Sequence, residues 1–188
     1  MDASLGEVVL AVCLGLGLAA AAGLRIFVPP FVLSAASLLG LVKLAPGLGW
    51  MGSWPALLAF GVALGAEISA YFVPWLDNLL DALGAPLAVL AGVVLLAAPL
   101  ESVSPLTRWT LAVLVGGAAA GGVHIGAALL RKASSLATGG LANWVVATGE
   151  AVMAFSLAVL AVVLPLLAVA CVLLALALAR RLARPARG

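Results

Sequence analysis

Charged residues are scarce in this chain: Lys, Arg, Asp and Glu make up 9% of it, whereas soluble domains carry roughly 25%. This scarcity excludes an ordinary soluble domain. A hydrophobic content of 66% and a mean hydropathy of +1.33 indicate an integral membrane protein. Because a span takes roughly 20 residues, we predict an all-α, polytopic transmembrane helix bundle of about six or seven helices, with broken or re-entrant helices.

Histidine and cysteine are also rare, which limits the chemistry. One His, His124, and two Cys without CxxC spacing do not supply a zinc-binding set, and the sequence leaves any other metal unknown. The chain has no phosphate-binding loop, no dinucleotide fingerprint, no GxSxG elbow and no HExxH motif. We therefore expect neither an enzyme nor a cofactor.

Prolines divide the apolar sequence into segments. Pro29-Pro30 interrupts the first span, and the next segment, from Phe31 to Ala45, is short enough either to cross the membrane or to re-enter. We expect one continuous span from Trp54 to Trp75, with aromatic anchors at both ends. The apolar run from Trp144 to Ala179 is too long for one crossing and is expected to fold back at Pro165.

Two segments nearly repeat each other. Ala19–Ile26 and Ala118–Ile125 agree at five of eight positions and align Arg25 with His124. We predict two repeat halves, 1–100 and 101–188, in one membrane domain. A re-entrant segment after Pro30 would make the halves inverted, with both chain ends cytoplasmic, and a crossing segment would make them parallel. We favour the inverted arrangement.

The C-terminal tail, 180–188, is basic and carries four of the nine Lys and Arg residues. By the positive-inside tendency we expect this end to be cytoplasmic. A topological anchor explains the tail better than a nucleic-acid site, so we expect no nucleic-acid partner. Arg outnumbers Lys and Ala and Leu dominate, which is consistent with a GC-rich bacterium and predicts its cytoplasmic (inner) membrane.

Ionisable residues within apolar runs are the candidate functional residues, because a charge in hydrocarbon costs a few kcal/mol or more. If the Trp54–Trp75 span is continuous, Glu67 falls close to the bilayer midplane, where a carboxylate can exchange protons or hold a cation. Glu150 is its counterpart in the second half. Arg25, at the proline break, and His124 are the expected charge partners. The alternative is structural: Glu67 pairs with Arg25 or caps a broken helix.

Further residues are of secondary interest. Asp77 and Asp81 share one face of a helical turn and either join the site or form a solvated cap. Small-residue ridges more simply pack helices within one subunit than join two, although a homodimer stays open; these are Gly61-xxx-Gly65, Gly117-xxx-Gly121 and Gly122-xxx-Gly126.

Several motifs together resemble a bacterial membrane family known as domain of unknown function 4126: Gly23-Leu-Arg-Ile-Phe-Val-Pro29, Glu67 with Val73–Asp77 and Asp81, and Gly139–Asn143 with Glu150. The resemblance covers about Leu14 to Leu167, adds Asn143 as a secondary site residue and implies no activity. Where members carry Asp-Lys and Glu-Asp, this chain has Tyr71-Phe72 and Glu150-Ala151. The leading glutamates remain, while neighbouring charges are lost.

Three functions follow from these observations. The leading hypothesis is a small transporter or channel for an ion or small polar solute, coupled to protons or not, in which Glu67 and Glu150 line a midplane cavity. The alternative is a membrane scaffold or assembly factor whose buried acids hold helices together. A lipid-handling protein, with a groove near Arg25, ranks third. In each case the lipid bilayer is the surrounding partner.

Overall fold

The computed structural model describes residues 4–69, 74–139 and 143–182, except for the side chains of 74–82, 143, 144, 179, 180 and 182. Within these ranges the protein consists of seven helices and contains no strand, which confirms the all-α prediction. The helices are α1 (Leu5–Leu24), α2 (Val28–Leu38), α3 (Trp54–Ser69), α4 (Pro74–Ala97), the continuous α5–α6 helix, α7 (Asn143–Val163) and α8 (Pro165–Leu182). The α5–α6 helix consists of α5 (Pro105–Leu111), a π-helical segment (Ala112–Gly117) and α6 (Ala118–Thr138), and a short 3-10 turn (Gly49–Gly52) precedes α3.

Three helical stretches of the described chain are long and apolar enough to cross a membrane: Leu5–Leu24, Pro105–Thr138 and Val145–Val163. Large apolar side chains cover the outside of the bundle, among them Leu58, Val62, Leu114, Ile125 and Leu173, each more than half exposed. An apolar outer surface is what lipid requires and what water disfavours. The prediction of a membrane protein is therefore confirmed.

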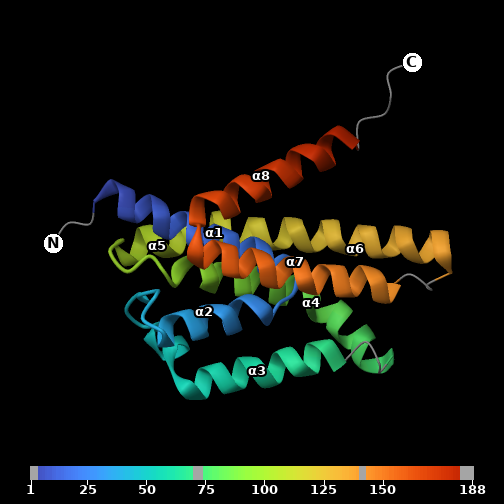
Figure 1. The fold of residues 1–188 in the computed structure, drawn as a ribbon, viewed down its shortest axis with the longest axis horizontal. Coiled ribbons are helices and arrows are strands. Elements are labelled where there is room, and N and C mark those ends of the chain that lie inside the picture. Colours follow the sequence, from blue (N-terminus) through green and yellow to red (C-terminus); the bar gives the residue numbers. More distant parts are fainter. Residues whose placement is uncertain (1–3, 70–73, 140–142, 183–188) are drawn as a thin grey trace.

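The prolines break the chain where the sequence predicted. α1 ends at Leu24, and α2 begins at Val28 with Pro29 and Pro30 in its first turn, where their missing N–H groups cost least. α7 ends at Val163 and α8 begins at Pro165, which confirms the expected fold-back. With 11 residues, α2 is about 16 Å long and cannot cross a bilayer core of about 30 Å. α2 returns toward the end from which α1 came, and α3 starts from that same end (Figure 1), so the chain runs back along the bundle, which does not fit a re-entrant segment.

The prediction of one span from Trp54 to Trp75 is wrong. α3 ends at Ser69, and Trp75 belongs to α4, which runs back in the opposite direction (Figure 1). Pro74 is the first residue of α4, a position that suits a residue without an N–H donor. Glu67 consequently lies in the last turn of α3 and not in the middle of a long span.

Helix α1 is the centre of the bundle and contacts α4, α6, α7 and α8. Its inner residues are small: Ala19 to Ala22 are fully buried, and three glycines face neighbouring helices. Gly15 lies against Leu96 of α4, Gly17 against Ala161 of α7 and Ala168 of α8, and Gly23 against Ala120 of α6. Small residues allow backbones to approach closely, which is how helices gain packing energy in lipid.

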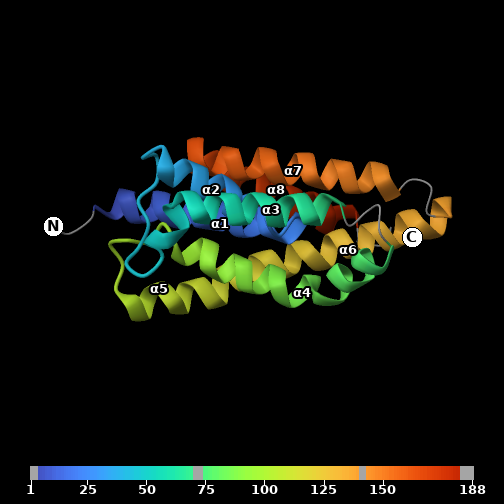
Figure 2. The same cartoon turned by 90° about the horizontal axis from the view of Figure 1, so that it is seen from below.

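Neighbouring glycines also establish the helix directions. Gly15 lies beside Leu96, which itself contacts Gly116 just before α6, whereas Gly23 lies beside His124 farther along α6. α1 and α6 therefore run in the same direction, as Figures 1 and 2 show. The start of α1 and the end of α8 lie at opposite ends of the long axis.

The glycines facing α1 should be far less tolerant than those facing outward. A Cβ at Gly23 would stand 2.6 Å from the Cβ of Val123, so Gly23→Ala should destabilise the bundle by roughly 1–3 kcal/mol. Gly126, on α6, has no neighbour within 4 Å of an added Cβ, and Gly126→Ala should leave the unfolding midpoint unchanged or raised, since Ala favours helix. Thermal unfolding in detergent measures both, and equal midpoints would contradict the packing argument.

Candidate functional site

Arg25 lies at the point where the central helix stops. Its backbone is extended, with φ −143° and ψ 121°, and its N–H donates to the carbonyl of Ala21, which completes the last turn of α1. The side chain is 5% exposed and reaches α7, where Nη2 donates to the carbonyl oxygen of Ala147 at 2.7 Å. An extended residue at the helix end turns the guanidinium away from the axis of α1 and toward α7.

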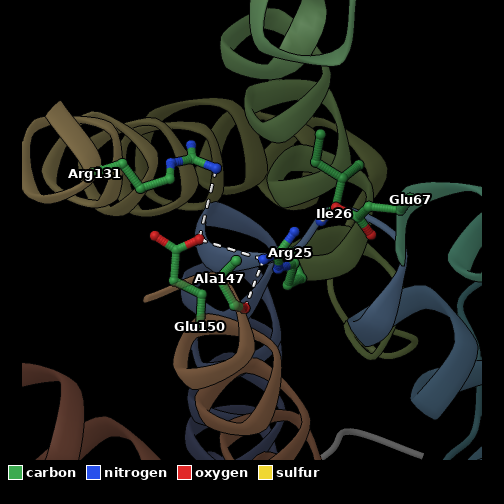
Figure 3. A network of polar contacts seen from close by, with 6 residues as sticks. All are labelled: Arg25, Ile26, Glu67, Arg131, Ala147 and Glu150. Carbon is green, nitrogen blue, oxygen red and sulfur yellow. Dashed lines mark hydrogen bonds and ion pairs between the residues drawn. The ribbon is translucent and has the colours of Figure 1, made fainter. Parts of the chain in front are cut away.

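Glu150, one turn farther along α7, receives two guanidinium groups. Its Oε2 lies 3.5 Å from Nη2 of Arg25 and 3.6 Å from Nη1 of Arg131 of α6, and its side chain is 1% exposed (Figure 3). Breaking a buried ion pair by removing one partner costs about 3–5 kcal/mol, because the remaining charge is left without compensation. Glu150 therefore ties the ends of three helices, α1, α6 and α7, to one another.

Glu67, in the last turn of α3, binds backbone rather than a side chain. Its Oε1 accepts the N–H of Ile26 at 2.9 Å, and its Oε2 accepts the N–H of Phe27 at 3.1 Å. These two N–H groups belong to the break between α1 and α2, where no helical carbonyl is in place to accept them. A carboxylate is well suited to the positive, N-terminal end of α2. Of the two structural alternatives, the geometry is that of a capped broken helix.

Four ionisable groups lie together in one cluster. Glu67 lies close enough to Arg25 and Arg131 to interact with their charges, so the cluster contains two acids and two bases. Glu67 is 13 residues from Trp54, about 20 Å along α3, and Glu150 is six residues from Trp144, about 9 Å along α7. Because α3 and α7 run in opposite directions (Figure 1), both acids lie toward the same end of the bundle.

His124 lies in the middle of α6, against two neighbouring helices. Its ring faces Gly84 of α4, where an added Cβ would meet Cε1 at 2.9 Å, and its backbone lies beside Gly23 of α1. Gly122 and Gly126, which flank His124 in the sequence, have open space beside them. Glycines of the partner helices, not those flanking His124, make the close approach.

The small-residue ridges differ in their surroundings. A Cβ added at Gly117 or Gly121 would meet Val89 of α4, and one added at Gly61 would lie 3.4 Å from the Phe31 ring. Gly65 and both glycines of Gly122-xxx-Gly126 have nothing within 4 Å of an added Cβ. The ridge Gly117-xxx-Gly121 therefore packs against α4 within the subunit.

Arg131 is a member of the cluster that the sequence did not reveal. Its position next to Lys132 at the end of an apolar run is typical of an interface anchor. The available signal was its spacing: Arg131 lies seven residues after His124, two turns along one face of a helix. The side chains of the secondary candidates Asp77, Asp81 and Asn143 lie outside the described part of the structure.

The comparison with known families settles the relationship that the motifs indicated. The profile of a family described as "Domain of unknown function (DUF4126)" matches residues 12–185. The chain belongs to this family. No curated protein and no solved structure matches the chain. Within the DUF4126 pattern, the two motif glutamates Glu67 and Glu150 supply both acids of the cluster.

The ion pairs should behave as one unit on mutation. Glu150→Gln should destabilise the protein by about 3–5 kcal/mol, because it leaves two guanidinium groups without their carboxylate. Adding Arg131→Gln should cost less than the sum of the single effects. Lys132→Gln, which alters the exposed neighbour, is the control and should be neutral. Chemical unfolding in detergent measures this cycle, and strict additivity would show that Arg131 and Glu150 are not coupled.

Proposed function

We propose that this protein is a small transporter or channel for an ion or small polar solute, in which Glu67 is the group that changes partners. The observation that supports this most is the helix break inside the bundle, whose N–H groups are held by a carboxylate from α3. Discontinuous helices with polar backbone at membrane depth form the substrate and ion sites of many secondary transporters. Such backbone is tolerated only where protein or a polar path covers it.

Proton coupling follows from the type of contact that Glu67 makes. An ionised carboxylate accepts from both N–H groups, whereas a protonated one carries a donor on one oxygen and holds the break less firmly. Uptake of a proton or a cation by Glu67 would thus loosen the break between α1 and α2. Arg25, anchored by Glu150 and Ala147, stays in place while this happens.

A membrane scaffold is the second candidate, and one observation favours it. Both oxygens of Glu67 already have backbone donors, and one oxygen of Glu150 lies within 4 Å of two guanidinium groups. Acids with protein partners of this kind can hold α1, α3, α6 and α7 together without meeting a solute. The two candidates differ in what Glu67 does after the protein has folded.

Flux measurements separate the two candidates. In proteoliposomes with an internal pH-sensitive dye, the wild-type protein should dissipate an imposed pH gradient in the presence of Na⁺, K⁺, chloride or phosphate. Glu67→Gln should slow this by at least about tenfold, equivalent to roughly 1.4 kcal/mol in the barrier. Glu101→Gln, an exposed acid, is the control and should transport normally. If Glu67→Gln transports at the wild-type rate, Glu67 has no part in the mechanism.

Stability measurements give the complementary result. In Glu67→Gln, the side-chain NH2 group would face one of the two backbone N–H donors of the break. Two donors cannot form a hydrogen bond with each other, so the variant should lose about 1–3 kcal/mol of stability. The scaffold proposal predicts this loss of stability together with no flux in either the wild type or the variant. Flux in the wild-type protein would eliminate the scaffold as the sole function.

We also propose that the chain arose by duplication and that its C-terminal end is cytoplasmic, in the inner membrane of a bacterium. The matched segments around Gly23 and Ala120 lie against each other, and α1 and α6 run in the same direction, which favours parallel over inverted copies. Arg131 and Lys132 lie toward the C-terminal end of α6 and Arg181 toward that of α8, and both helices run toward the same end of the long axis. By the positive-inside tendency this end faces the cytoplasm.

A further inference from the structure

Arg108 is a buried cation at the end of the bundle farthest from the charge cluster. It lies in α5, beside the loop 39–48, and only 5% of it is exposed. Its Nη2 donates to the carbonyl of Pro46 at a long 3.4 Å, and its Cζ lies 5.9 Å from the centroid of the Trp109 ring. Figures 1 and 2 both show α5 next to this loop.

The polar partners of Arg108 are too few for a buried guanidinium. The group has five N–H donors, yet within the described residues it makes one long hydrogen bond and no ion pair. Nε is enclosed and has no acceptor, and Nη1, which is not among the enclosed atoms, makes no hydrogen bond with the described residues. A buried charge is costly without an opposite charge, so this site lacks an anion.

Arg25 is also a buried arginine, but its polar partners belong to the chain itself. There a carboxylate lies at 3.5 Å and a carbonyl at 2.7 Å on the same nitrogen. At Arg108 the nearest acid in the sequence, Glu101, is exposed and does not pair with it. The described residues therefore leave Arg108 short of an acceptor.

The surroundings indicate which anion fits. Exposed tryptophans, Trp50 at 57% and Trp54 at 67%, lie at this end of the bundle and indicate the headgroup level of the membrane. Lys43, exposed on the same loop as Pro46, adds a second positive charge. A guanidinium binds phosphate through two parallel hydrogen bonds, and phosphate is the anion found at this level of a bilayer.

We propose that Arg108 and the loop 39–48 form a binding site for a phosphate group, supplied by the headgroup of an anionic phospholipid or by free phosphate. The guanidinium fork holds the phosphate oxygens, and the ring of Trp109 supports its face. The carbonyl of Pro46 fixes one end of the fork and orients the remaining donors. This site is separate from the proposed function and does not depend on it.

Binding to the purified, delipidated full chain in a neutral detergent tests the site. The chain is titrated with phosphatidylglycerol, phosphatidylcholine or inorganic phosphate, and the unfolding midpoint is followed. Phosphatidylglycerol or phosphate should raise the midpoint saturably, and Arg108→Gln should weaken the apparent affinity by at least about tenfold. Arg108→Lys, which keeps the charge but loses the fork, should fall between the two. Arg181→Gln, an exposed arginine of α8, is the control and should bind normally.

The outcomes are distinct. An Arg108-dependent shift with inorganic phosphate alone supports the site and identifies free phosphate as the source, whereas a shift that requires phosphatidylglycerol identifies the lipid. Equal affinity in the wild type and Arg108→Gln, or equal shifts with every ligand in all variants, overturns the proposal. If Arg108→Gln does not fold, the affinity of Arg108→Lys decides: a wild-type value would contradict a bidentate site.

Discussion

The structure depends on one constraint: where the central helix α1 ends, the buried charge and the free backbone N–H groups need partners. α1 ends inside the bundle, so it exposes both a basic side chain and unsatisfied backbone groups to a region that lipid surrounds. The effective penalty for an unpaired ion there is several kcal/mol. Glu150 meets Arg25, and Glu67 meets the N–H groups of Ile26 and Phe27. Without these contacts the break would leave a buried charge and two backbone N–H groups without partners.

Small residues make this arrangement sterically feasible. A helix surrounded by α4, α6, α7 and α8 needs close backbone approach on several sides, and Gly15, Gly17 and Gly23 each provide one such side. Close packing also brings Arg131 of α6 and Glu150 of α7 within ion-pair distance across the end of α1. Packing and electrostatics thus act at the same place, which is why the cluster can join four helices.

The buried arginines at the two ends of the bundle differ in their polar partners. At one end the acids and bases are balanced, and the helix break is held by protein groups alone. At the other end Arg108 has a carbonyl and an aromatic ring but no acid among the described residues. This difference is the basis for the two proposals, movement of an ion or proton at the charge cluster and binding of a fixed anion at Arg108.

The sequence by itself determined the all-helical membrane class, the breaks at Pro29-Pro30 and Pro165, and the buried acids Glu67 and Glu150, because composition, proline chemistry and the cost of buried charge act locally. Only the tertiary structure decided the partners: Glu67 holds backbone, Glu150 holds Arg25, and Arg131 joins them. It also ended α3 at Ser69, which places Glu67 in the last turn of that helix. Partners depend on how far each helix rotates and slides against its neighbours, and the spacing of residues along one chain does not encode those two quantities.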